Sequence, residues 1–179
     1  MAETLAPQLV EFFTNIFGDG MVSNYVIIFL ISLLPILELR GGLIAAYALH
    51  VPLIPAMIVC YIGNMLPIPF ILIFIKKIFE WMRKHNILVK FVDWVEAHGQ
   101  KKAEEMKQKQ SKFEEWGLMA FVAIPLPGTG GWTGSLIAAL LGMDTKKAFK
   151  VIAVGVAVAG IIVASLSYGL FDLIIGLFK

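Results

Sequence analysis

The sequence predicts an all-α integral membrane protein made of two inverted repeats, each a re-entrant helical hairpin followed by a spanning helix, plus amphipathic interfacial helices. Three observations indicate this fold class. The 179-residue chain is 59% hydrophobic and only 16% charged, whereas roughly a quarter of the residues of a soluble domain are charged. Two long apolar runs are free of charge, and two further apolar stretches are interrupted by charged, proline or glycine residues.

Residues 1–20 are predicted to form an amphipathic helix that lies on the membrane. Leu9, Phe13 and Ile16 recur at helical spacing, with polar residues between them. Packing of this helix against the hairpins is the open alternative. The stretch carries no lysine or arginine, so we expect no cleavable signal peptide.

The first repeat is predicted to cover residues 21–75, with its hairpin at residues 25–49. The break Glu38–Gly42 separates two apolar arms, Tyr25–Leu37 and Leu43–Leu49. The arms have 13 and 7 residues, whereas a helix needs about 20 apolar residues to cross a hydrocarbon core of ~30 Å. Each arm is therefore too short to span alone and suits a hairpin that enters and leaves on one side.

A spanning helix is predicted at residues 56–75, an uncharged run of 20 residues. Asn64, Pro67 and Pro69 lie within this run. Because proline removes a backbone donor, we expect these residues to interrupt or kink the helix. Carbonyl groups freed there either face a cavity or simply mark a kink.

Residues 76–116 are predicted to form a charged and partly amphipathic cytoplasmic segment. Ten of the fifteen basic residues of the chain fall between Lys76 and Lys112. Residues 87–96 show the pattern of an amphipathic interfacial helix. Residues 100–112 are almost free of apolar side chains, so we expect a solvated helix or a hinge there.

The second repeat is predicted to cover residues 117–179, with a re-entrant hairpin at 117–143 and a transmembrane helix at 148–171. The break Pro125–Gly134 divides this hairpin. Each break is followed by the same tetrapeptide, Leu-Ile-Ala-Ala, which favours a repeat. The spanning run carries small residues four apart, and these serve either packing within the chain or a homodimer.

Two topologies compete for the four apolar regions. If all four spanned the membrane, Lys146–Lys150 would lie on the opposite side from the charged segment, although short basic loops tend to stay in the cytoplasm. With re-entrant hairpins both basic clusters are cytoplasmic, and thirteen of the fifteen basic residues lie inside. We therefore favour the hairpins and expect a multi-pass protein of the cell (inner or plasma) membrane.

Glu38 and Arg40 are the only charges that we expect at membrane depth. Charges there are costly unless paired or hydrated, so they indicate function. Glu38 would exchange a proton, because loss of water favours the neutral carboxyl, while Arg40 would bind an anionic head group or hold Glu38 ionised. An internal ion pair that fastens the hairpin tip is the alternative. Because residues two apart do not share a helix face, we expect this pair to lie in a turn.

The second break offers an uncharged, glycine-rich surface. Glycine allows left-handed backbone and close approach by a substrate, and N–H groups at the start of a helix over Ser135–Met143 would form an anion-binding nest. A tight turn that binds nothing is the alternative. Besides Glu38 and Arg40, the predicted substrate- and proton-binding residues are Gly41, Gly42, Pro125, Pro127, Gly128, Thr129, Gly130, Trp132, Thr133 and Gly134.

Other kinds of site are not indicated. The chain has one cysteine, Cys60, which excludes an internal disulfide and a cysteine-based metal cluster. Nucleotide-loop, metalloprotease and nucleophile-elbow motifs are absent, so we expect neither an enzyme nor a bound cofactor or metal. The expected partners are membrane lipids, protons and a small lipophilic or lipid-phosphate substrate, with no nucleic acid.

The two breaks resemble those of the small multi-drug export protein family. The likeness lies in Pro35 with Glu38–Gly42 and in Pro125–Gly134, and it covers roughly residues 25–170. This family is similar, at a distance, to the DedA (VTT-domain) membrane proteins. That resemblance implies paired re-entrant hairpins that face each other, with an acidic and a basic position at the first tip. It also implies proton-dependent transport or flipping of lipid-linked phosphates, and the multi-drug label implies export of lipophilic cations.

We therefore expect a proton-coupled membrane transporter that moves a small lipophilic or lipid-linked substrate through a midplane site between the hairpins. A DedA-type flippase or scramblase for a polyprenyl phosphate or phospholipid is the first alternative. A non-transporting membrane scaffold, in which both breaks are structural, is the second.

Overall fold

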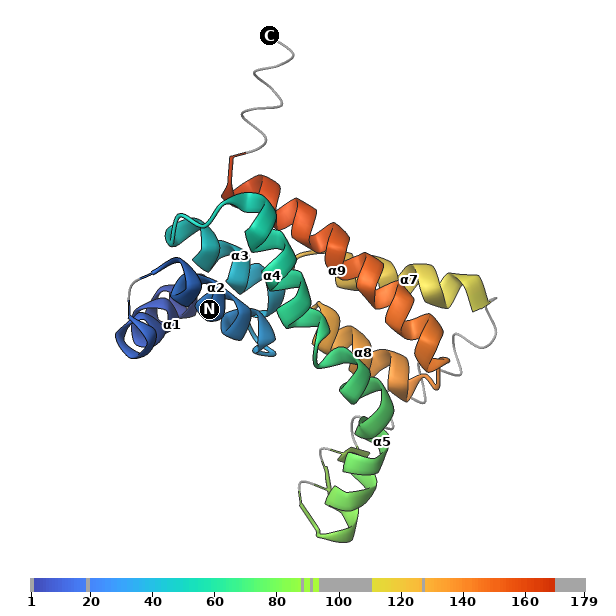
Figure 1. The fold of residues 1–179 in the computed structure, drawn as a ribbon. Coiled ribbons are helices and arrows are strands. Elements are labelled where there is room, and N and C mark those ends of the chain that lie inside the picture. The colour runs from blue at the N-terminus through green and yellow to red at the C-terminus, as the bar shows by residue number, and fades with distance from the viewer. Residues whose placement is uncertain are drawn as a thin grey trace.

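The computed structural model describes residues 2–18, 20–87, 89–90, 92–93, 111–126 and 128–169. The described residues form helices and contain no strand (Figure 1). The helices are α1 (Ala2–Phe17), α2 (Met21–Leu33), α3 (Glu38–Ala48), α4 (Leu53–Met65), α5 (Ile68–Lys84), α7 (Ser111–Ala123), α8 (Gly131–Leu140) and α9 (Thr145–Ser167).

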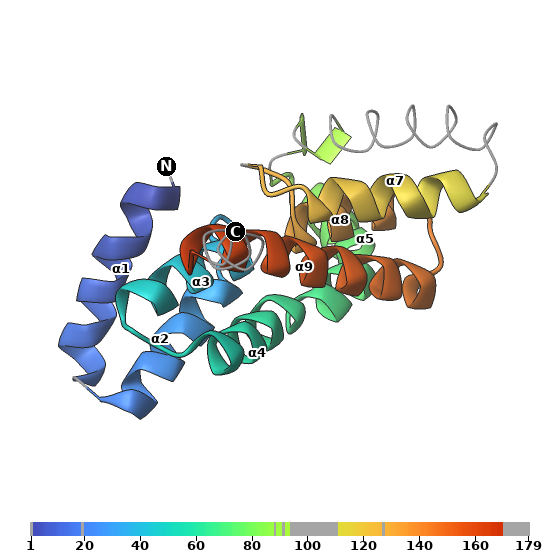
Figure 2. The same ribbon diagram turned by 90° about the horizontal axis from the view of Figure 1, so that it is seen from above.

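Two helical hairpins lie on either side of the central helices α4 and α9 (Figure 1, Figure 2). The first hairpin, α2–α3, packs on α4, and the second hairpin, α7–α8, packs on α9. Each hairpin also contacts the other half of the molecule, because α3 packs on α9 and α8 packs on α5. This exchange brings the starts of α3 and α8 together.

The four hairpin helices are too short to cross a bilayer. They have 13, 11, 13 and 10 residues in chain order, which correspond to about 15–20 Å of helix against a hydrocarbon core of ~30 Å. α3 and α8 begin at Glu38 and Gly131, which are 93 positions apart. The two Leu-Ile-Ala-Ala tetrapeptides, starting at Leu43 and Leu136, have this same separation. The tetrapeptide therefore occupies the same place in both helices.

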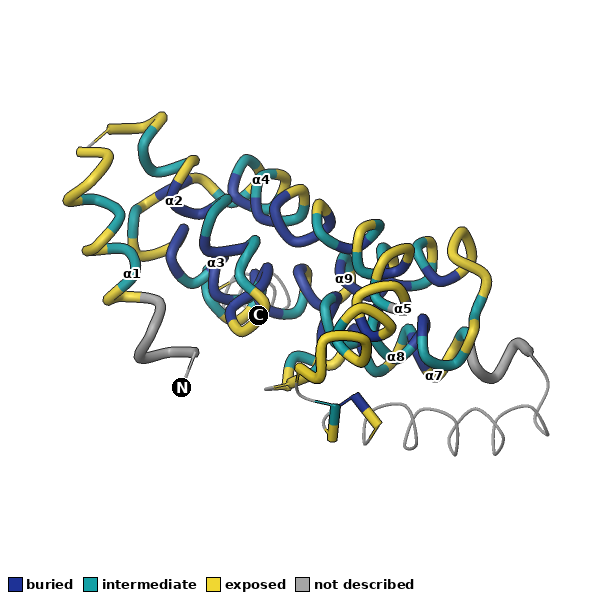
Figure 3. The backbone as a smooth tube through the Cα atoms, turned by 90° about the horizontal axis from the view of Figure 1, so that it is seen from below, coloured by how far each residue is buried: buried dark blue, intermediate teal, exposed yellow. Residues whose placement is uncertain are grey.

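Two segments are long and apolar enough to span a membrane. These are Leu53–Ile75 and Thr145–Ser167, each of 23 residues, and only 33% and 39% of their most apolar stretches is buried inside the protein. Ile54, Ile58 and Ile62 form an apolar stripe on α4 with 69%, 56% and 52% of each residue exposed (Figure 3). An apolar stripe of this kind suits contact with lipid rather than with water.

The first spanning segment is broken where the prolines predict it. α4 and α5 meet at Leu66 and Pro67. Pro67 has no N–H to donate to the carbonyl one turn before it, whereas Pro69 lies in the first turn of α5, where N–H groups lack helical acceptors anyway. α5 then continues to Lys84, so the helix extends well beyond the apolar run and into residues 76–116.

α9 is continuous and runs antiparallel to α4–α5. At one end the Tyr168 hydroxyl donates to the Val51 carbonyl, 3.0 Å away, just before α4 begins. Further along, the Tyr61 hydroxyl of α4 donates to the Ala153 carbonyl of α9 at 3.2 Å. At the other end, the start of α9 lies beside α5. The basic residues in Lys146–Lys150 therefore lie at the same end of the molecule as those of α5.

Glycine permits a close crossing between each spanning segment and the first arm of its hairpin. A Cβ at Gly63 of α4 would lie 2.7 Å from the Phe29 carbonyl oxygen of α2. A Cβ at Gly155 of α9 would lie 2.8 Å from Val122 Cβ and 3.0 Å from the Met119 carbonyl oxygen of α7. On this face the small residues of α9 serve packing within the chain. The homodimer stays a prediction.

The N-terminal helix α1 packs on α2 and α3. Its Phe12 and Ile16 nevertheless are 56% and 58% exposed. α1 therefore combines packing against the first hairpin with an apolar face that is free to meet lipid. Half of the predicted amphipathic stretch 87–96, and most of residues 100–112, lie outside the described residues.

Replacing Gly155 with valine is expected to destabilise the protein by about 1–3 kcal/mol, because the Met119 carbonyl belongs to the backbone and cannot turn away. Val154→Leu adds bulk at the preceding position, where the side chain is 51% exposed, and should leave stability unchanged. Thermal unfolding in detergent measures both effects. Equal unfolding midpoints for the two variants would contradict the close crossing.

Candidate functional site

The tips of the two hairpins meet through a buried carboxylate. The first tip comprises residues 34–40, and the second tip comprises residues 124–126 and 128–132. Glu38 Oε2 accepts a hydrogen bond from the backbone N–H of Gly131 at 3.1 Å, and Oε1 accepts one from Trp132 at 3.1 Å. Only 4% of Glu38 is exposed. These two hydrogen bonds are called the tip contact below.

The position of the donors explains why a charge is tolerated there. Gly131 and Trp132 open α8, where a helix leaves its first N–H groups without internal acceptors. The helix dipole also places partial positive charge at this end, so an ionised carboxylate is favoured. α3 begins at Glu38 as well, so the starts of two helices converge on one carboxylate. The tip contact thus satisfies backbone groups that hydrocarbon cannot satisfy.

The backbone of Glu38 is left-handed. Its φ angle is 52°, which residues other than glycine rarely adopt. Strain of this kind amounts to about 1–3 kcal/mol, persists only where surrounding contacts fix the residue, and gathers at functional sites. The strained backbone therefore singles out Glu38 among the residues of the first tip.

Arg40 makes the complementary contact with carbonyl groups of the second tip. Its Nη1 donates to the Leu126 carbonyl, and its Nη2 donates to the Thr129 carbonyl and, at 3.0 Å, to the Thr129 hydroxyl. That hydroxyl in turn donates to the Ile124 carbonyl at 2.7 Å. The guanidinium fork therefore satisfies carbonyl groups that are exposed where α7 has ended.

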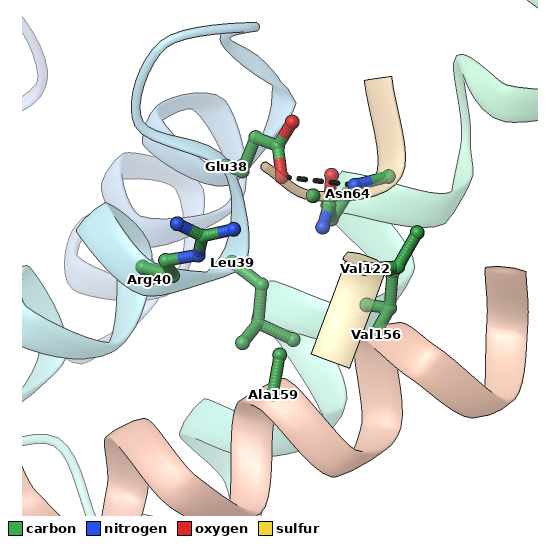
Figure 4. A pocket seen from close by; sticks show the side chains of 9 residues that line it. Glu38, Leu39, Arg40, Asn64, Val122, Val156 and Ala159 are labelled. Atoms are coloured by element: carbon green, nitrogen blue, oxygen red, sulfur yellow. Dashed lines mark hydrogen bonds between the residues drawn. The ribbon is translucent and has the colours of Figure 1, made fainter. Parts of the chain in front are cut away.

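Glu38 and Arg40 bind the opposite hairpin instead of each other. Within the described part of the chain, the two side chains do not approach within the 4.0 Å of an ion pair. Figure 4 shows the Arg40 guanidinium lying apart from the Glu38 carboxylate. The helix is interrupted as expected, but the turn covers residues 34–37, and both charged residues lie just after it in the first turn of α3. From that turn one binds N–H groups and the other binds carbonyl groups.

Asn64 is a third polar residue of the site, which the sequence analysis treats only as an interruption of a helix. Its side-chain amide donates a hydrogen bond to the Glu38 carboxylate (Figure 4). Asn64 is only 2% exposed, and its Oδ1 has no hydrogen-bond partner among the described residues. A polar amide inside an otherwise apolar run was the signal that could have assigned it to the site.

A small cavity lies next to the tip contact. Its volume is about 10 Å³, and its lining includes Glu38, Arg40, Asn64, Gly130, Val156 and Ala159. This is about the space of one water, which would donate to Asn64 Oδ1. Pockets for drug-sized ligands have about 300–1,000 Å³. The tips are therefore closed in this conformation, without room for a larger substrate between them.

Three of the predicted glycines serve helix packing rather than the cavity. A Cβ at Gly42 would lie 2.9 Å from Cys60 Sγ, and one at Gly134 would lie 2.5 Å from Val122 Cγ2. A Cβ at Gly41 would lie 2.6 Å from a side chain of the preceding turn. These three positions are therefore close contacts between or within helices, and none of them lines the cavity.

The remaining predicted residues lie in or beside the second tip. Trp132 donates its backbone N–H to Glu38, while its indole Nε1 is buried without a hydrogen-bond partner in the described residues. Pro125 and Gly128 precede α8, and Thr133 lies in its first turn. Pro127 lies outside the described residues.

The expected helix over Ser135–Met143 has the wrong bounds, because α8 covers Gly131–Leu140. Ser135 lies inside α8, where its hydroxyl donates to the Gly131 carbonyl at 2.6 Å. Glycines of the break therefore begin the helix instead of preceding it. The N–H groups at this start are bound by Glu38, so the predicted anion nest holds a carboxylate of the protein itself.

Gly130 gives the carboxylate room to approach α8. Its φ angle is 134°, which favours glycine. A Cβ at this position would lie 2.7 Å from Glu38 Cδ. Any side chain here would therefore displace the carboxylate from its donors.

The site lies within the region that defines a known family. The model of the family described as "Putative small multi-drug export protein" matches residues 38–162. The chain belongs to this family. No curated protein and no solved structure gives a significant match. The matched region contains Glu38, Arg40, Asn64 and the second tip. The description of the family as an export protein, together with the two long apolar segments, indicates a membrane transport protein.

Gly130→Ala is expected to destabilise the protein by about 1–3 kcal/mol, because the added methyl group collides with the Glu38 carboxylate. Gly128→Ala is the matched control. Gly128 also has a positive φ, 82°, but a Cβ there meets nothing within 4 Å, so this variant carries backbone strain alone. Unfolding midpoints in detergent should fall further for Gly130→Ala than for Gly128→Ala.

The same pair of variants can be measured in a Glu38→Ala background. Without the carboxylate, the extra loss caused by Gly130→Ala should disappear. An undiminished loss would show that Gly130 acts independently of Glu38.

Proposed function

We propose that this protein is a proton-coupled exporter of small lipophilic molecules, rather than an enzyme, and that Glu38 binds the transported proton. The observation that carries the proposal is the tip contact, in which one buried carboxylate holds two N–H groups of the opposite hairpin. The strength of such a contact depends on the charge of Glu38. Proton binding is therefore able to change how the hairpins sit against each other.

We further propose that both hairpins are re-entrant and inverted relative to each other, with their tips near the middle of the membrane. Three observations support this arrangement. The hairpin helices are short, α3 packs on α9 while α8 packs on α5, and the basic residues of α5 and α9 lie at the same end of the molecule. The positive-inside rule makes that end cytoplasmic. The first hairpin then enters from outside and the second from the cytoplasm of the inner or plasma membrane, as in inverted-repeat transporters.

Protonation of Glu38 weakens the tip contact. Hydrogen bonds to a charged group contribute about 1.5–3 kcal/mol each, against about 0.5–1.5 kcal/mol for neutral pairs. A protonated carboxyl also turns one of its two oxygens into a donor, which then faces an N–H group of α8. The closed arrangement is therefore that of ionised Glu38, and the protonated form allows the tips to separate.

Separation of the tips is what makes room for a substrate. The closed cavity of about 10 Å³ holds no drug-sized molecule, and its walls include the apolar side chains of Leu39, Val122 and Val156. Apolar walls around one carboxylate favour a lipophilic cation over an anion. A proton and such a cation would compete for Glu38, and this competition couples export of one to entry of the other.

The flippase alternative receives less support from the site. A lipid phosphate needs a free basic group, but both Nη atoms of Arg40 are bound to carbonyl groups of the second tip. In our proposal Arg40 instead positions the second tip for Glu38. Membership of an export family favours transport over the scaffold alternative.

Glu38→Gln is expected to abolish pH-driven transport, because glutamine cannot bind and release the proton. The measurement uses proteoliposomes with an imposed pH gradient and ethidium, a fluorescent lipophilic cation, as the probe. Glu80→Gln, which removes an exposed carboxyl of α5, is the control and should transport normally. Full activity of Glu38→Gln would refute the proton role.

The position of the tips gives a second readout for Glu38→Gln that does not require a transported probe. Spin labels at Ile36 and Leu126, which are 70% and 55% exposed, report the distance between the tips. In the otherwise unchanged protein this distance should grow as the pH falls. In Glu38→Gln it should no longer respond to pH. A pH-independent distance in the parent protein would contradict the mechanism.

The topology predicts which cysteines a membrane-impermeant maleimide reaches in intact cells. Ala48→Cys should be labelled from outside, whereas His85→Cys and Lys147→Cys should react only after the membrane is opened; all three positions are exposed. Cys60 is buried and serves as the unlabelled background. External labelling of Lys147→Cys would overturn the inverted arrangement.

A further inference from the structure

A second, larger cavity lies between α5 and the start of α9. Its volume is about 340 Å³, which is within the size range of ligand pockets, about 300–1,000 Å³. Its lining residues are Pro69, Leu72, Thr145, Lys146, Phe149 and Lys150. None of these residues lines the cavity at the tips.

The walls of this groove are apolar and its edge is basic. Pro69 and Leu72 of α5 form one wall, and Phe149 of α9 forms the other. Lys146 and Lys150 are both exposed, and their spacing of four residues places them on the same side of α9. The groove therefore offers an apolar channel with two ammonium groups beside it.

The charge of these two lysines is not neutralised by the rest of the described chain. Their neighbour Lys147 pairs with Glu115 of α7 at 3.9 Å, and Asp144 accepts a hydrogen bond from the Lys147 backbone N–H at 3.0 Å. No ion-pair partner for Lys146 or Lys150 is found among the described residues. Among the described residues, Glu115 and Asp144 are thus both engaged with Lys147.

We propose that this groove binds an anionic phospholipid, with an acyl chain along Pro69, Leu72 and Phe149 and the phosphate at Lys146 and Lys150. The groove lies at one end of a membrane-spanning helix, where acyl chains and head groups meet. Basic pockets between helices at this level select anionic head groups. The apolar walls favour a lipid over a free anion, because a free anion leaves them exposed to water.

The bound lipid would link α5 to α9 on the far side of the Pro67 break. α5 touches α9 near this groove, and its exposed Phe70 and Ile73 continue the apolar surface next to it. An acyl chain in the groove adds contacts to both helices at once. The lipid therefore stabilises this end of the molecule, and its effect does not depend on Glu38 or on proton coupling.

The proposal is tested by thermal unfolding of the full chain in detergent with added lipid. Dioleoyl phosphatidylglycerol should raise the unfolding temperature more than dioleoyl phosphatidylcholine does, since a ligand of the folded state stabilises it by mass action. The double variant Lys146→Ala/Lys150→Ala should lose this preference. Lys147→Ala, which removes a neighbouring lysine outside the groove, should keep it.

Two further variants distinguish the effect of the lysine charges from a folding defect and from binding of the acyl chain. Lys146→Arg/Lys150→Arg keeps both charges and should keep the preference, so a loss in the alanine variant is not a general defect of the helix. Phe149→Ala should reduce stabilisation by the anionic lipid although both lysines remain. Glu38→Gln should keep the preference for the anionic lipid in full. The lipid site is therefore tested independently of the proposed proton site.

Glycerol phosphate, which has the charge but no acyl chain, tests whether the site binds a lipid or a free anion. Glycerol phosphate should not change the unfolding temperature at the concentration at which the lipid acts. Equal stabilisation by glycerol phosphate would overturn the proposal in favour of a free-anion site. An undiminished preference in Lys146→Ala/Lys150→Ala, or an equal loss in Lys147→Ala, would overturn it as well.

Discussion

The relation between the two hairpins depends on one buried carboxyl group, that of Glu38. A carboxylate removed from water is unfavourable by several kcal/mol unless hydrogen-bond donors surround it. Glu38 receives donors from Gly131, Trp132 and Asn64, which come from two different helices. Their convergence requires α8 to begin at the second tip and α4 to end beside it. α4 and α8 are therefore both held by hydrogen bonds to a single side chain.

The same site supplies hydrogen-bond partners for the unpaired backbone groups of helices that begin or end inside the protein. A helix leaves N–H groups unpaired at its start and carbonyl groups unpaired at its end. Here an acidic residue binds the N–H groups of α8, and the basic Arg40 binds carbonyl groups that follow α7. Side chains of the first tip thus do for the second tip what water does in a soluble protein. The close crossings at Gly63 and Gly155 hold the first arm of each hairpin against its own spanning segment.

The helical membrane architecture and the importance of Glu38 and Arg40 are predictable, because apolar runs and their interruptions are local features of the sequence. The partners of these residues are not, since the tip contact joins positions 93 and 94 apart. The start of α8 is missed for the same reason, as the carboxylate that caps it comes from another helix. Glycine is ambiguous in sequence: Gly42 serves helix packing, whereas Gly130 admits the carboxylate.

The proline break makes the two halves of the protein mechanically unequal. α9 is an unbroken rod of 23 residues, whereas the matching segment of the first half is divided at Pro67. Pro67 donates no backbone hydrogen bond at that joint, so the joint is held by fewer such bonds than the interior of α9. The spanning segment of the first half is therefore the more easily bent of the two, and α9 is the stiffer.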